Sequence, residues 1–278
     1  MQGCSGEVWL TSALTDEDVP NALTLCCSLK RVFTSRKIAV IYSSKVSKNL
    51  KEALNYGFDL LFHLEEDRNT AELKNEEFVK LFALTLKSFE KCVYLSPNML
   101  VLRNCDELLD QEDENCQQFV WTEKSDTSIF MVRPSLQVFN TLMKSLHSRN
   151  GYTVEHYLRK WVKNQGTECR FIEEKYNRLI SPQNGMLLGS EKDISIVNLG
   201  NKTNTNGIHT GNGFAIENIL QFRKQIYEQD VHPILAFQST VPSTIPKIII
   251  QQYEVQLLEP RSPHLFRNYS AILRRFRI

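Results

Sequence analysis

A short polar break separates two buried-looking runs of the chain and is the first place where its residues could bind a ligand. Ser96-Pro97-Asn98 stands between the apolar runs Cys92–Leu95 and Met99–Leu102. Open α/β sheets place ligands at such points, where a strand ends near a change of strand order. A divalent cation there would need oxygen ligands, and preferably charged ones. Ser96 and Asn98 are neutral and Pro97 has no backbone N–H, so the break predicts a ligand site that is poorly equipped for a metal.

The elements that position this break follow from hydrophobic patterning. We expect a long apolar helix over Phe78–Lys91, with Lys80 near its start, leading into the strand Cys92–Leu95. Upstream, three strands alternate with two helices, over Val8–Thr11, 22–33, Lys37–Tyr42, Ser47–Tyr56 and Asp59–Leu64. This alternation predicts parallel strands joined by crossover helices. The glycine-rich fingerprints of dinucleotide and P-loop sites do not occur in the chain.

The second half of the chain is less regular. It predicts strands at 119–121, Ile129–Val132, 171–172, Ile194–Val197 and Lys247–Val255, and helices at 134–147, Thr153–Lys163 and 215–227. A polar loop rich in Asn, Thr and Gly covers Gly200–Gly213. We therefore expect one α/β domain over residues 1–235 and a C-terminal extension, 236–278, that packs on it or forms a tail.

Three segments around the break carry a family resemblance. Val79-Lys80-Leu81, 91–95 and 100–102 resemble the core of glycogenin and its relatives in glycosyltransferase family 8. The resemblance runs from Trp9 to about Gly200 and weakens after Asp110. It implies a GT-A-like fold that binds nucleotide-diphosphate sugars, with a mixed, mostly parallel central sheet flanked by helices. It also implies a hexosyltransferase that uses a UDP-sugar donor.

The metal ligands of that family are replaced in this chain. The family holds a divalent ion with an Asp-x-Asp pair, where this chain has Ser96-Pro97-Asn98. Its third ligand is a histidine two residues before a Leu-Gly pair, and Val197 takes that place. His209 could substitute, although a single loop histidine is more often solvated. We therefore expect no metal ligands and no cofactor, with Mn²⁺ needed only if the chain is an active transferase.

The resemblance also assigns donor contacts. It places Leu10 and Thr11 at the first contacts with the donor base and Asp18 at the position of a stacking tyrosine. Asp18 cannot stack, and we interpret it as the N-cap of the following helix. Lys80 matches a lysine that contacts the donor, but a lone lysine on an apolar helix can equally extend its ammonium to the surface.

The sugar end of the resembled site is altered as well. Asp126 begins the segment that corresponds to an Asn-Ser-Gly in the family, and Glu155-His156 corresponds to an Asp-Gln pair. Glu155 could bind sugar hydroxyls or act as a weak general base beside His156. A solvated helix face is the alternative. After Tyr176-Asn177 no tyrosine occurs before Tyr227, so the acceptor tyrosine of self-glucosylating glycogenin is missing.

Composition limits the partners. The chain has 33 basic and 32 acidic residues, so its net charge gives no reason to expect nucleic acid or a membrane surface as partner. No run of 18 apolar residues occurs and no signal-like segment opens the sequence, which predicts a soluble, cytoplasmic protein. Seven cysteines without a C-x-x-C pair are expected to be reduced and mostly buried.

Three functional hypotheses remain open at this stage. The first is a catalytically weakened or inactive glycogenin-like protein that binds or scaffolds a protein partner, or forms a homodimer. The second is an active UDP-sugar transferase with a metal-independent or rearranged site, in which Lys80, Arg103 or Lys202 neutralises the diphosphate. The third is a nucleotide-binding regulator that handles no sugar. Replacement of nearly every polar position, with the apolar frame retained, favours the first.

Overall fold

A computed structural model describes residues 6–64, 76–110, 119–121, 128–147, 154, 158, 170–180, 194–200 and 214–237. Within these ranges the predicted first half is confirmed. The chain runs through β1 (Glu7–Ala13), α1 (Val19–Arg31), β2 (Lys37–Ser43), α2 (Lys48–Gly57) and β3 (Leu60–Leu64). The predicted strand at 247–255 and most of the predicted helix at 153–163 lie outside the described residues.

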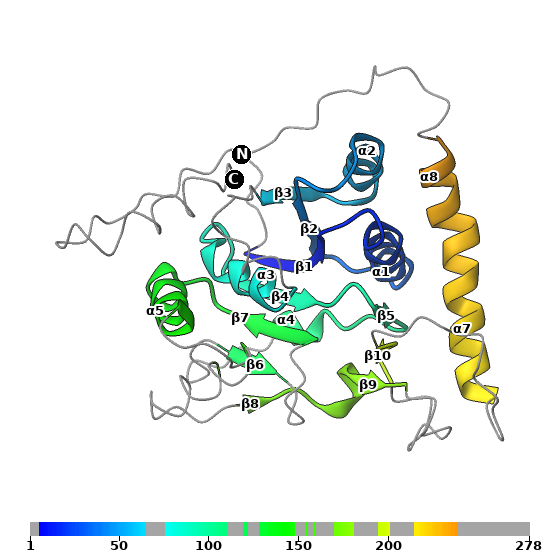
Figure 1. Cartoon of the computed structure of the whole chain (residues 1–278). Coiled ribbons are helices and arrows are strands. Elements are labelled where there is room, and N and C mark those ends of the chain that lie inside the picture. Colours follow the sequence, from blue (N-terminus) through cyan, green and yellow to red (C-terminus); the bar gives the residue numbers. More distant parts are fainter. Residues whose placement is uncertain are drawn as a thin grey trace.

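The central sheet has the described order β3-β2-β1-β4-β7-β6-β8 (Figure 1). Its remaining strands are β4 (Lys91–Leu95), β6 (Phe119–Trp121), β7 (Ile129–Val132) and β8 (Arg170–Phe171). Only β7 runs against its neighbours, because β4 and β6 both pair with it antiparallel while the other pairs are parallel. The expected mixed, mostly parallel sheet is therefore confirmed, with β4 at its centre.

Helices cover both faces of this sheet (Figure 1). One face is covered by α1, α2 and a helical rod, which share one apolar core with Trp9, Val40 and Val93. The rod consists of α7 (Phe214–Ile226), a π-helical turn (Tyr227–Val231) and α8 (His232–Phe237). On the other face, α5 (Leu136–His147) packs with a 3₁₀ helix against Leu10 and Tyr94. Strand residues alternate between the two cores, as period-two side chains must.

The expected long helix at 78–91 is wrong. A single α-turn, α3 (Glu76–Val79), passes into a 3₁₀ helix, η2 (Lys80–Thr85), and the chain turns before β4. The Thr85 hydroxyl donates to the carbonyl of Phe82 at 2.7 Å, and Leu86 N–H donates to Ala83 C=O at 3.3 Å. These i to i−3 bonds tighten the segment, and 3₁₀ runs are short.

A second, smaller sheet follows the break. It has the order β5-β10-β9, formed by β5 (Met99–Val101), β9 (Arg178–Leu179) and β10 (Ile196–Asn198). The remaining described elements are α4 (Glu107–Asp110) and a 3₁₀ turn at Glu174–Tyr176. Pairing of β10 with β5 brings the segment before Gly200 against the residues that follow the break.

Candidate functional site: the carboxyl edge of the sheet

The break lies at the carboxyl end of the central strand, as predicted. Ser96 N–H donates to Ser128 C=O at 2.8 Å, which ties the end of β4 to the start of β7. Met99 N–H donates to Ser96 C=O at 3.0 Å and closes a turn around Pro97. Ser96 and Pro97 are buried, and Asn98 is partly exposed. The backbone of the break is therefore held firmly on both sides.

The segment before Gly200 reaches this turn through the second sheet. Leu199 N–H donates to Asn98 C=O at 3.1 Å, and Asn198 pairs with Met99. The Asn198 side chain accepts from Gly200 N–H at 2.9 Å and is buried. Gly200 has a φ of +68°, a conformation that glycine adopts without strain. Leu199-Gly200 identified this loop in the sequence, but the side chain that makes a polar contact with it is that of Asn198.

Val197 is a core residue in this structure. It lies in β10 opposite Leu100, is fully buried, and belongs to the core shared with α1. A divalent ion does not fit this arrangement, because Ser96 and Asn98 are neutral and Val197 has no donor atom. Among the described residues no group of three or more His, Cys, Asp or Glu side chains could hold a metal ion.

The loop after β1, where the resemblance places the donor base, is held by Asp18. Its carboxylate accepts from the backbone N–H groups of Leu14 at 3.0 Å and Thr15 at 2.9 Å, and from the Thr15 hydroxyl at 3.0 Å. The capping interpretation is therefore only half right. Asp18 occupies the N-cap position of α1, but it makes no side-chain bond to the helix and folds back on the preceding loop.

Leu10 and Thr11 lie inside the sheet, within β1, which extends two residues beyond Thr11 to Ala13. Leu10 is buried in the core beneath α5. Thr11 is 2% exposed, and its hydroxyl has no hydrogen-bond partner among the described residues. On the opposite face of β1, Ser12 and Tyr94 share a buried hydrogen bond of 2.8 Å between their hydroxyls. Thr11 is thus the one predicted contact with an unused polar atom in the described structure.

Lys80 is buried, with 6% of its surface exposed, at the start of η2. Because η2 contacts β1, β4 and α5, this lysine lies in the layer that packs on the α5 face of the central sheet. Its burial argues against the alternative in which its ammonium extends to the surface. Asp126, Glu155, His156, Lys202 and His209 lie outside the residues whose side chains are described.

Tyr176 directly precedes the segment in which glycogenin carries its acceptor tyrosine, and its role here is structural. Tyr176 is buried, and its hydroxyl donates to Glu107 at 2.7 Å. Burial raises the pKa of Tyr176, and its hydrogen bond to Glu107 raises that pKa further. Arg103 is exposed and directly precedes Asn104, whose side chain donates to the carbonyls of Val32 and Phe33. Those carbonyls follow α1, so Arg103 lies toward the amino edge, away from the break.

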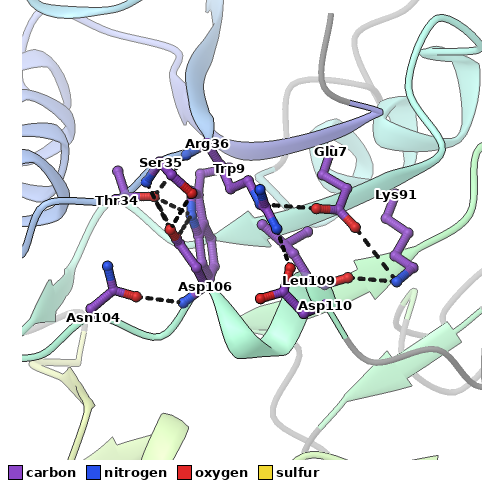
Figure 2. Close-up of polar contacts among 10 residues, drawn as sticks. All are labelled: Glu7, Trp9, Thr34, Ser35, Arg36, Lys91, Asn104, Asp106, Leu109 and Asp110. Carbon is purple, nitrogen blue, oxygen red and sulfur yellow. Dashed lines mark hydrogen bonds and ion pairs between the residues drawn. The ribbon is translucent and has the colours of Figure 1, made fainter.

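The amino edge carries a separate polar cluster that sequence patterning did not single out (Figure 2). Asp106 accepts from Trp9 Nε1 at 3.1 Å, from the Thr34 hydroxyl at 2.5 Å, and from Ser35 N–H at 2.7 Å. Burial alone would raise the pKa of Asp106, but these hydrogen bonds outweigh it and hold the pKa below its usual value. The ionised carboxylate joins β1, the α1–β2 turn and α4.

Ion pairs extend this cluster (Figure 2). Arg36 Nε lies 2.9 Å from Glu7 Oε2, an ion pair without hydrogen-bond geometry, and Arg36 also contacts Asp110. Lys91 lies 3.6 Å from Glu7 and donates to Leu109 C=O. Every charge drawn in Figure 2 has a partner among the residues drawn, so the cluster holds β1, β4, α4 and the turn between α1 and β2 together.

No protein-family model matches the chain. Among curated proteins, Glycogenin-1 of Caenorhabditis elegans is 28% identical over 156 residues, 52% of this chain and 36% of the relative. Glycogenin-1 of Oryctolagus cuniculus is 27% identical over 147 residues, 49% of this chain and 44% of the relative. Glycogenin-2 of Homo sapiens is 30% identical over 148 residues, 50% of this chain and 30% of the relative. The matched segment thus spans less than half of each of these relatives.

Solved structures match over more of the chain. The glycosyltransferase GlyE of Streptococcus pneumoniae has a TM-score of 0.59 at 12% identity, covering 85% of this chain and 64% of its own. The galactosyltransferase LgtC, in complex with donor and acceptor sugar analogs, has a TM-score of 0.54 at 11% identity, covering 78% and 95%. The fold is that of the GT-A glycosyltransferases. Within that fold, the chain is glycogenin-like in sequence.

Proposed function

We propose that this glycogenin-like protein has lost metal-dependent sugar transfer and serves as a binding or scaffolding protein. The observation that carries the proposal is the composition of the carboxyl edge. Neutral Ser96 and Asn98 stand where the family has two carboxylates, and Val197 is fully buried where the family has a histidine. Stabilising the leaving diphosphate is usually the largest catalytic contribution, so removing its counter-ion lowers the rate by several orders of magnitude.

The active-transferase alternative rests on one observation. Lys80 is a buried cation in an element that contacts β1 and β4, and a positive charge near the ends of these strands could offset part of a diphosphate's charge. In that case a UDP-sugar donor would bind without metal. Glu155 and His156 would then act on the sugar, and Asp126 would contact it. Arg103 does not belong to this alternative, because it lies toward the other edge.

Calorimetric titration of the full chain with UDP and with UDP-glucose, each with and without manganese, separates the two. The proposal expects manganese to leave the affinity for both ligands unchanged and expects no hexose transfer to water or to added maltooligosaccharides. Tight manganese-dependent binding of UDP would refute it. Metal-independent binding of UDP-glucose accompanied by turnover would replace it with the alternative.

Several finer points remain expectations of the sequence. A protein partner or homodimer, a cytoplasmic location and a C-terminal extension over 236–278 belong to the same proposal. The described part of the chain contains no helix long and apolar enough to cross a membrane. Residues 238–278 lie outside the described residues, so the domain division stays a prediction.

A further inference from the structure

A cavity of about 700 Å³ opens at the amino side of the sheet, away from the break. It lies between the carboxyl ends of α1 and α2 and the rod formed by the π turn and α8. Cys27, Phe33, Tyr56, Gly57, Pro233 and Ile234 supply its apolar wall. Lys30, Arg31, Gln229 and Asp230 supply its polar groups. Its volume falls within the range of ligand-binding cavities, roughly 300–1,000 Å³.

Two aromatic side chains at this cavity are unusually exposed. Phe33 is 87% exposed and Tyr56 is 66% exposed. Phe33 also has a φ of +58°, a left-handed conformation that is strained for a bulky residue. It follows the C-cap of α1, and its N–H donates to Lys30 C=O, a position where helices favour glycine. A phenylalanine there adds strain and buries almost no surface against the described residues. Packing within the described fold therefore does not explain why this position holds a phenylalanine, whereas a contact with another molecule would.

The facing wall carries a second backbone irregularity. The π-helical turn Tyr227–Val231 interrupts the rod between α7 and α8, and such turns often occur at functional sites. It turns two polar side chains toward α1. Arg31 Nε donates to Asp230 at 2.6 Å, and Arg31 also donates to Gln229 Oε1 at 2.8 Å. Two irregular segments from distant parts of the sequence therefore meet at one cavity.

The state of the polar groups decides which kind of ligand fits. Arg31, Gln229 and Asp230 are already bonded to one another, so they offer little to a sugar or nucleotide that must be recognised by hydrogen bonds. Burial raises the pKa of Cys27 to about 11, so its thiol is a poor nucleophile and a poor metal ligand. The accessible surface that remains is apolar and aromatic, and interfaces between proteins favour such surface together with arginine.

Lys30 adds a charge preference. Lys30 is an exposed residue, and its ammonium donates to the carbonyl of Gly57. An ammonium has three donors, so it can still pair with an incoming carboxylate. Among the lining residues two cations face one anion, Asp230. A partner with an acidic group beside a bulky apolar side chain is complementary to this surface.

We propose that the cavity bounded by Phe33, Tyr56 and Ile234 is a docking site for a segment of another protein that presents a bulky apolar side chain next to a carboxylate. The side chain packs against the apolar wall that includes the two aromatic rings, and the carboxylate pairs with Lys30. This inference goes beyond the proposed scaffolding role and does not depend on it, because the cavity and the break lie at opposite edges of the sheet.

The test uses the full chain and a fluorescein-labelled short peptide with Phe-Leu at its centre and Glu on either side. Fluorescence polarisation should show saturable binding that weakens as salt is added. Replacing the flanking Glu by Lys, or the central Phe-Leu by Ser-Ser, should weaken binding at least about tenfold. No binding of the acidic apolar peptide, or equal binding of all three peptides, refutes the proposal.

Phe33→Gly separates docking from folding. Glycine relieves the strain at +58°, so the melting temperature should stay the same or rise while peptide affinity falls at least about tenfold. Tyr56→Ser and Lys30→Gln should also weaken binding. Leu179→Ser is the matched control, because Leu179 is 55% exposed in β9, at a different part of the molecule, and should bind like the wild type.

Two other occupants would contradict the proposal. If a second copy fills the cavity, light scattering will show a dimer that Phe33→Gly dissociates, and the peptide will not bind to that dimer. If the chain's own residues 238–278 fill it, a photoreactive amino acid at Tyr56 will cross-link to them within one chain. Either cross-link or dimer, found in place of peptide binding, overturns the assignment to a foreign segment.

Discussion

Val197 lies directly across the antiparallel pair of β10 and β5 from Leu100, and both side chains are fully buried in the same core. Paired residues of an antiparallel ladder point to the same face. The position that resembles a metal-binding histidine therefore belongs to the packed interior of this protein. Valine at this position packs in the core and has no side-chain atom that could bind a metal.

This relationship shapes the first prediction, which restores the ligands. The triple variant Ser96→Asp, Asn98→Asp, Val197→His should gain manganese-dependent UDP affinity of roughly tenfold or more. Charge-assisted contacts are worth about 1.5–3 kcal/mol each, and about 1.4 kcal/mol is one decade. Calorimetry with UDP and manganese measures the gain. In the wild type, manganese should change nothing.

The control for that experiment is Val197→His alone. Burying an imidazole without a partner costs about 1–3 kcal/mol, so this variant should melt at a lower temperature than the wild type. Manganese should recover part of that loss only in the triple variant. The loss-of-metal interpretation fails if the unmodified protein binds UDP tightly with manganese and loses that binding on Asn98→Ala.

Asp106 gives the second prediction, on stability. Asp106→Ala removes the acceptor for Trp9, Thr34 and Ser35 and leaves buried donors without partners. We expect the free energy of unfolding to fall by roughly 2–4 kcal/mol, the range for a broken network around a buried charge. Urea unfolding monitored by circular dichroism measures this. Ser35→Ala removes only one hydroxyl contact and should cost less than half as much.

The same carboxylate predicts a pH dependence. Its folded pKa is depressed below the unfolded value of about 3.9. Its stabilisation is therefore fully present above about pH 5 and is lost as pH falls through the folded pKa. Asp106→Asn cannot ionise, so its stability should fall less than that of the wild type between pH 6 and the acid range. Parallel acid profiles for the two proteins would contradict the assignment.

The sequence predicted the parallel half of the fold well, because period-two strands and amphipathic helices alternate there without interruption. It failed at 78–91, where a continuous apolar run does not distinguish a long helix from a short helix followed by a turn and a strand. It also missed the cluster around Asp106. The residues that surround Asp106 come from three separate segments, and only tertiary pairing brings Trp9 to a carboxylate 97 positions away.

Near the candidate site, the sequence predicted the boundaries of elements better than the partners of side chains. Ser96–Asn98 ends β4 because a proline and two small polar residues stop an apolar strand. Asp18 was placed correctly at the start of α1, but its partners were not, since a carboxylate near an N-cap can bond forward to the helix or back to the loop. The cavity beside Phe33 had no sequence signal, because its walls combine α1, α2 and the π turn.

The third prediction concerns self-modification. Between Asn177 and Tyr227 the chain has no tyrosine, and Tyr176 is buried with its hydroxyl bonded to Glu107. Incubation with UDP-glucose and manganese should therefore add no hexose within Arg178–Ile226. Intact-mass spectrometry followed by peptide mapping checks this. A ladder of hexose additions on a peptide from that range would show that another side chain serves as acceptor.

The last prediction tests the buried hydroxyl within β1. Thr11 is enclosed at 2% exposure, and its Oγ1 has no partner among the described residues. Valine has nearly the same shape and carries no hydroxyl, so Thr11→Val should raise the free energy of unfolding by about 1 kcal/mol, since an unpaired buried hydroxyl is costly. Ser12→Ala is the matched control. The Ser12 hydroxyl is bonded to Tyr94 at 2.8 Å, so removing it should destabilise. Urea unfolding of both variants measures the contrast, and a Thr11→Val protein less stable than the wild type would show that the hydroxyl has a partner.

A titration with UDP tests whether the Thr11 hydroxyl contacts the nucleotide. If Thr11→Val weakens UDP binding while Ser12→Ala does not, the unpaired oxygen of Thr11 contacts the nucleotide of the sugar donor. That result would support the active-transferase alternative, which the neutral residues at the metal position argue against.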